Sequence, residues 1–143
     1  MQTAPACTAA DAGVMWKSMS DIEIQEKIES IQQLVESEPV RCIKELNEFL
    51  ALNPEVSAAW MLKAAIHFER EEHVEATEAF AHVIEKKPKN ESASNGLFHS
   101  LWESGKTDAA LEEMKRYFRE VGLNSTTQTA QDYRAIVKEI NSA

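Results

Sequence analysis

Residues that make tight turns are scarce in this sequence. Only 4 glycines and 4 prolines occur among its 143 residues. A β-sandwich or β-barrel connects many short strands through turns rich in these residues, so this composition disfavours both folds. We therefore expect an all-α fold, in a chain of about one domain that is long enough to bury a real core.

Cysteines and long apolar runs are scarce too. The two cysteines, Cys7 and Cys42, are too few and too far apart for a disulfide framework or a metal site. A reducing compartment is then the default, and we expect a cytoplasmic protein. No stretch approaches the roughly 18 consecutive apolar residues that cross a bilayer, so no membrane segment is predicted.

Positive charge is in deficit. The sequence has 15 Lys and Arg residues against 24 Asp and Glu residues, which gives a net charge of −9. A field of this sign repels nucleic acid and anionic lipid, so neither is an expected ligand. The expected partner is a protein or peptide, and one of basic character.

Small residues dominate the first eighteen positions, MQTAPACTAADAGVMWKS. This stretch lacks both the charged start and the long apolar centre of a secretory signal. It also cannot bury enough surface to order itself. We expect a disordered leader over residues 1–19 and a helical domain over residues 20–143, with Met15 and Met19 as alternatives to Met1 for the natural start.

Capping residues and prolines divide the first part of the domain into helices. Ser20 and Glu23 have the spacing of a capping box, which opens a first helix expected to end near Ser37. Pro39 suits the first turn of a second helix, where its missing N–H costs nothing. The pair Asn53-Pro54 ends that helix.

Four more helices are expected to complete three helical hairpins. The third and fourth run through Trp60 and through Phe80, and Lys87-Pro88 ends the fourth. The fifth is expected to end at Gly105, with Thr107 as the N-cap of a sixth that closes at Gly122.

The second helices of these hairpins repeat every 34 residues. Their small residues are Cys42, Ala76 and Ala110, and a bulky apolar residue follows each of them by four positions. A single hairpin cannot bury its apolar face alone and must stack on the next one, so this period predicts a repeat array.

With these residues in place, the chain resembles the tetratricopeptide repeat family over roughly residues 22–121. The middle repeat, AAWMLKAAIHFEREEHVEATEAFAHVIEKKP, matches the family pattern at Trp60, Ala64, Ala76, Phe80 and Pro88. The third repeat fits at Leu97, Gly105, Ala110 and Met114, and the first only at Cys42, Leu46 and Pro54. Lys63, His67 and Ser94 depart from the pattern. The resemblance implies stacked antiparallel helical hairpins, a TPR-like α-solenoid.

A last helix is expected beyond the repeats, to cap the exposed end of the stack. It follows the polar stretch GLNSTTQT, and Thr129 and Asp132 resemble the ends of another capping box. Tyr133 and Ile136 are expected to serve stacking.

The sequence contains no recognisable metal-binding or catalytic motif. None of the histidines His67, His73, His82 and His99 lies three or four positions from another, so no pair shares a helix face at chelating distance. His67 with Glu71 is the only close combination of possible ligands. No metal, no organic cofactor and no catalytic residues are therefore expected, and an enzyme is the third and least favoured class.

The resemblance implies a protein-binding groove on the first helix of each repeat. The expected groove residues are Ile31, Leu34, Met61, Ala65, Phe68, Asn95, His99 and Trp102. Phe68 and Trp102 are 34 residues apart and so occupy equivalent sites, which predicts a contiguous aromatic strip. Mostly apolar surfaces with aromatic anchors are typical of binding hot spots.

Two versions of a non-catalytic, protein-binding function stay open at this point. In the first the protein is an adaptor or chaperone-like module that takes a peptide into the groove. In the second it inhibits one folded partner, since the acidic sequence and its ending EEMKRYF…DYRAIVKEI are similar to immunity proteins of bacterial toxin systems. Self-association is a further possibility.

Overall fold

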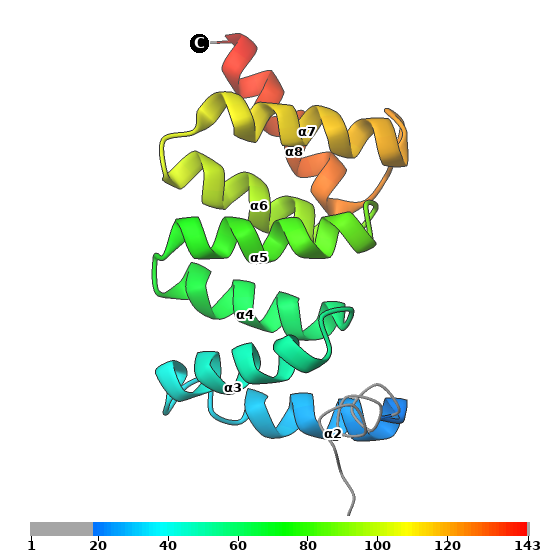
Figure 1. Ribbon diagram of the computed structural model, residues 1–143. Coiled ribbons are helices and arrows are strands. Elements are labelled where there is room, and N and C mark those ends of the chain that lie inside the picture. The colour runs from blue at the N-terminus through cyan, green and yellow to red at the C-terminus, as the bar shows by residue number, and fades with distance from the viewer. Residues whose placement is uncertain (1–18, 143) are drawn as a thin grey trace, which may run out of the picture. The chain divides into compact units, whose positions relative to one another are not determined.

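The computed structural model describes residues 19–142, which form seven helices and no strand (Figure 1). The helices are α2 (Asp21–Gln32), α3 (Pro39–Leu52), α4 (Ser57–Glu69), α5 (His73–Lys86), α6 (Glu91–Glu103), α7 (Thr107–Val121) and α8 (Gln128–Ser142). The expectation of an all-α fold is confirmed. Among these helices, none combines the length and the apolar character that a bilayer span requires. The predicted leader falls on residues 1–18, outside the described residues, except for Met19.

The described chain divides into two compact units within α4. Unit 1 extends to Leu62 and unit 2 begins at Lys63. In unit 1, α2 packs against α3; in unit 2, α6 packs against α5, α7 and α8. Helix α6 is therefore the centre of unit 2, and α8 is the helix that covers it after the last predicted hairpin (Figure 1).

The 34-residue period of the sequence corresponds to helix starts that recur at the same interval. Helices α3, α5 and α7 begin at residues 39, 73 and 107, and α4 and α6 begin at residues 57 and 91. The small residues that define the period, Cys42, Ala76 and Ala110, are all fully buried. A larger side chain at any of these fully buried positions would have to displace its packed neighbours.

Two predicted helix starts are confirmed. The Ser20 hydroxyl accepts from the Glu23 N–H at 3.2 Å, and the Glu23 carboxylate accepts from the Ser20 N–H at 2.9 Å. Pro39 is the first residue of α3. The end of α2 differs from the prediction, because the helix stops at Gln32 and the chain reaches Pro39 through turns, such as the one closed by the Leu34 N–H on the Ile31 carbonyl.

Two predicted N-caps are wrong, each by a short shift. Thr107 is the first residue of α7, and Lys106 holds the cap position. Thr129 lies inside α8, where its hydroxyl donates to the Glu91 carbonyl at 3.2 Å. Thr127 caps α8 instead, because its hydroxyl oxygen accepts from the Ala130 N–H at 3.2 Å. At α8, Thr127 and Thr129 are both possible caps, and spacing alone does not choose between them; at α7, Lys106 holds the cap position without a side-chain hydrogen bond.

Cys42 joins the two helices of unit 1. Its side chain has no exposed surface, and its Sγ donates to the Ile31 carbonyl at 3.3 Å. Burial raises the pKa of the Cys42 thiol, so the reactive thiolate is disfavoured.

We expect the Cys42 thiol to react slowly in the folded protein. In a Cys7→Ser variant, where Cys42 is the sole thiol, a disulfide reagent should modify the native chain at least about a hundredfold more slowly than the urea-unfolded chain, as expected if unit 1 must open locally at a cost of roughly 3 kcal/mol. Similar rates in the two states would show that α2 does not pack on α3 as described.

Candidate protein-binding surface

Helix α6 carries three of the predicted groove residues. It begins at the Asn90 N-cap, whose side-chain oxygen accepts from the Ala93 N–H at 2.8 Å, and it ends before Gly105, which takes a left-handed φ of +81°. Asn95, His99 and Trp102 recur at intervals of four and three residues and so share one face. Asn95 and His99 are half-buried, and Trp102 is 38% exposed.

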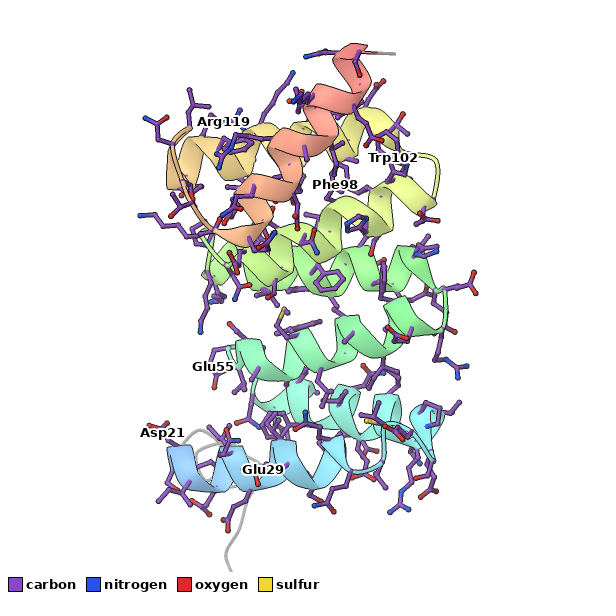
Figure 2. All side chains as sticks on the ribbon, turned by 180° about the vertical axis from the view of Figure 1, so that it is seen from behind. Asp21, Glu29, Glu55, Phe98, Trp102 and Arg119 are labelled. Atoms are coloured by element: carbon purple, nitrogen blue, oxygen red, sulfur yellow. The ribbon has the colours of Figure 1, made fainter. Side chains whose placement is uncertain are left out.

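Trp102 stacks on a buried aromatic side chain. Its ring stacks on Phe98, with centroids 5.7 Å apart and planes 27° apart, and both residues lie along α6 (Figure 2). Phe98 is buried and packs in turn on the ring of Tyr133 at 5.3 Å. Tyr133 also contacts Tyr117 and Phe118 of α7. An aromatic cluster (Trp102, Phe98, Tyr133, Tyr117 and Phe118) thus runs from the surface of α6 through the core of unit 2.

A buried polar cluster fixes Tyr133 in this position. The Ser94 hydroxyl donates to the Glu113 carboxylate at 2.7 Å and lies 2.8 Å from the Tyr133 hydroxyl. Since Ser94 has a single proton, Tyr133 donates to Ser94. Arg116 holds both oxygens of Glu113, each at 2.7 Å, and also reaches the Pro88 carbonyl at 2.9 Å. Burial raises the pKa of the Tyr133 phenol, so this hydroxyl stays a neutral donor.

Sequence reasoning missed this polar cluster. Ser94 was noted only as a departure from the tryptophan of the family pattern, and Glu113 was not singled out. Both are buried, and Glu113 is 5% exposed. The available signal was Glu113 with Arg116 three residues later, a spacing that brings a carboxylate and a guanidinium together on one helix face.

Helix α4 contributes the other two groove residues of unit 2, Ala65 and Phe68. Ala65 is exposed, and Phe68 is half-buried with its ring edge-on to His73 at 5.8 Å. Within the described residues, no ring contact joins Phe68 to Trp102, so the two rings do not form the continuous strip that their spacing predicts. Each ring contacts a different neighbour instead: Phe68 packs on His73 of α5, and Trp102 stacks on Phe98 of α6.

The groove residues of unit 1 differ in what they expose. Leu34 and Met61 are half-buried. Ile31 has no exposed surface and lies in the core of unit 1, where its carbonyl accepts from Cys42. As placed, Ile31 stabilises the packing of α2 on α3 and offers nothing to a partner.

The histidines do not form a chelating group. His67 pairs with Glu72 rather than with Glu71: its Nδ1 lies 2.9 Å from a Glu72 carboxylate oxygen, while Glu71 takes a left-handed φ of 60° in the turn after α4. The hydrogen bond with His67 lowers the pKa of Glu72. In the part of the chain that the structure describes, no three His, Cys, Asp or Glu side chains gather as metal ligands would.

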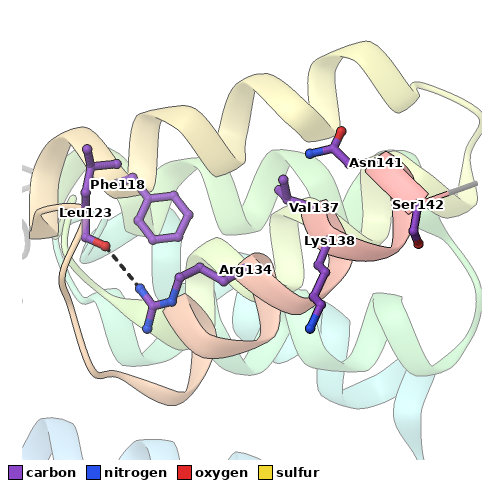
Figure 3. A pocket seen from close by; sticks show the side chains of 7 residues that line it. All are labelled: Phe118, Leu123, Arg134, Val137, Lys138, Asn141 and Ser142. Carbon is purple, nitrogen blue, oxygen red and sulfur yellow. Dashed lines mark hydrogen bonds between the residues drawn. The ribbon is translucent and has the colours of Figure 1, made fainter.

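A second surface of unit 2 lies between α7 and α8. It is a groove of about 610 Å³ lined by Phe118, Leu123, Arg134, Val137, Lys138, Asn141 and Ser142 (Figure 3). A smaller hollow of about 270 Å³, lined in part by Leu111 and Ile140, adjoins the same two helices. We call the larger one the α7–α8 groove. The sequence did not indicate this groove. Apolar residues recur along α8 with the same helical spacing whether they are exposed or packed against a neighbouring helix.

Comparisons with known proteins add no identification. The chain matches no protein-family model, and a search of curated proteins finds no significant match.

Proposed function

We propose that the protein is a non-catalytic helical-repeat protein of the tetratricopeptide type that binds a protein or peptide partner through the first helices of its hairpins. Support comes from helix starts that recur every 34 residues and from the packing of neighbouring helices within unit 2. In this proposal α8 caps the array. The partner surface comprises Ala65 and Phe68 of α4 with Asn95, His99 and Trp102 of α6.

Trp102 is the observation that carries the proposal. Tryptophan is the most enriched residue at binding hot spots, where a rigid aromatic ring gives contact area at low entropic cost. Here the ring is 38% exposed yet held by Phe98, which is itself buried, so little order has to be gained on binding. The net charge of −9 favours a basic partner for this surface.

Alanine substitution separates a binding role of Trp102 from a packing role. In a Trp102→Ala variant we expect affinity for the captured partner to fall by about 2 kcal/mol, roughly thirtyfold, with only a small drop in the thermal midpoint. Phe68→Ala should weaken binding less, because Phe68 is half-buried and shares its ring contact with His73. The partner would first be isolated from native lysate with the full chain as bait, and affinities measured by calorimetry.

Val74→Ala is the matched control, since Val74 is 57% exposed on a second helix, α5, and should leave binding unchanged. Unchanged binding by both aromatic variants, or a large loss of thermal stability in both, would contradict the proposal. Stoichiometric capture of one folded protein would favour the inhibitor version over a general peptide-binding module.

A further inference from the structure

The walls of the α7–α8 groove are apolar. Phe118 is half-buried, while Val137 is 40% exposed and Leu123 is 77% exposed. Ile140, at the adjoining hollow, is 44% exposed. Exposed apolar side chains that occur singly are ordinary, but here Phe118 of α7, Leu123 of the loop after it and Val137 of α8 line one hollow (Figure 3). Such a face is typical of a site where an apolar surface docks.

Two cationic side chains, Arg134 and Lys138, line this groove. Arg134 donates to the carbonyls of Leu123 at 3.1 Å and Ser125 at 2.8 Å, and its guanidinium lies 5.9 Å from the centre of the Phe118 ring. Lys138 lines the same groove, and among the described residues neither cation forms an ion pair. Within residues 19–142, no acidic residue lines the groove.

This local charge contrasts with that of the whole chain. Residues 20–62 contain nine acidic and three basic residues, whereas residues 107–143 contain six and five. Most of the net charge of −9 therefore lies in unit 1, on residues such as Asp21 and Glu29 of α2 (Figure 2). Among the described residues, Arg134 and Lys138 are the charged side chains that line the groove, so they are the charges that a ligand would contact there.

We propose that the α7–α8 groove binds an acidic amphipathic helix of a partner protein. Apolar side chains at helical spacing would fill the hollow between Phe118, Leu123 and Val137, as in other helix-in-groove complexes. Carboxylates beside that apolar face would neutralise Arg134 and Lys138, whereas a basic helix would leave like charges opposed. This surface uses none of the residues assigned to the proposed function, and it takes a ligand of the opposite charge.

The test uses a synthetic probe with the full-length protein. The probe is a labelled peptide of about 15 residues with leucines at i, i+3, i+4 and i+7 and glutamates at most other positions. We expect it to bind with a Kd in the range of about 1 to 100 μM, a free energy of roughly −5.5 to −8 kcal/mol, and to bind more weakly as salt is raised. A second peptide with lysine at every glutamate position should bind at least tenfold more weakly.

Variants of the protein locate the site. Lys138→Glu should weaken the acidic peptide about tenfold and strengthen the lysine peptide, and Val137→Asp should abolish binding of the acidic peptide. Lys106→Glu makes the same charge change at the N-cap of α7, outside the groove, and should have little effect. Trp102→Ala should also leave peptide binding unchanged, which keeps this result separate from the test of the proposed function.

Three results would overturn the proposal. The first is no binding of the acidic peptide up to about 1 mM, the weak limit of specific recognition. The second is equal or tighter binding of the lysine peptide, and the third is equal loss on Lys138→Glu and Lys106→Glu. Concentration-dependent self-association that Val137→Asp removes, without peptide binding, would instead assign the groove to a second copy of this chain.

Discussion

Replacing Arg116 by methionine is expected to lower the free energy of unfolding by about 3 kcal/mol, because it leaves the carboxylate of Glu113 buried without its counter-charge. Glu113 is 5% exposed, and Arg116 is the only cation that contacts it among the described residues. The Ser94 hydroxyl alone cannot replace two charge-assisted hydrogen bonds. Urea unfolding followed by circular dichroism measures the loss.

Two further variants serve as controls for this prediction. Arg119→Met removes an exposed guanidinium from the same helix and should change the free energy of unfolding by less than about 0.5 kcal/mol (Figure 2). A double variant, Glu113→Met with Arg116→Met, should be more stable than Arg116→Met alone, because no buried charge is then left unpaired. If Arg116→Met costs no more than Arg119→Met, the carboxylate of Glu113 is solvated and the cluster is not formed.

This cluster also shows what the sequence could not reveal. Helix positions followed from local features: the Ser20 capping box, Pro39 and the glycines after α6 and α7 act within one turn of the residues they affect. Ser94 and Tyr133 lie 39 positions apart, and only the packing of α8 on α6 brings them together. Nothing in the local pattern around Ser94 indicates that a hydroxyl there meets a phenol from the last helix.

Exposure within the candidate binding surface was equally hard to predict. Ile31 and Trp102 both sit on first helices and both fit the groove pattern, yet Ile31 has no exposed surface and Trp102 is 38% exposed. A helical period identifies a face, but neighbouring helices decide which turns of that face are covered. In unit 1 the turn at Ile31 is covered by α3, through Cys42.

The charge at a particular surface was also hard to predict from the sequence. The net value of −9 is a property of the whole chain, and from it we expected a basic partner. The distribution differs between the two units, and among the residues that the structure describes the α7–α8 groove is lined by Arg134 and Lys138 and by no acidic side chain. Summed charge bears on long-range steering, whereas the side chains at a site determine which ligand fits it.

Gly96→Ala is expected to destabilise unit 2 by about 2 to 3 kcal/mol, although alanine is the better helix former by about 1 kcal/mol. Gly96 lies inside α6, and an added Cβ would overlap the ring of Phe80 on α5. Phe80 is 5% exposed and closely packed, so its ring cannot move aside without displacing other core residues. The steric cost therefore exceeds the gain in helix propensity, and urea unfolding should show the difference.

A compensating change at Phe80 tests whether this contact is the cause. Phe80→Leu alone should cost about 1 to 2 kcal/mol, because it removes part of a buried ring. In the double variant with Gly96→Ala, the new methyl group would occupy the vacated space. The loss of unfolding free energy in the double variant should therefore be at least 1 kcal/mol smaller than the sum of the losses in the two single variants, as coupled neighbours show. Strict additivity, or a Gly96→Ala variant more stable than the parent, would show that α5 and α6 do not approach through Gly96.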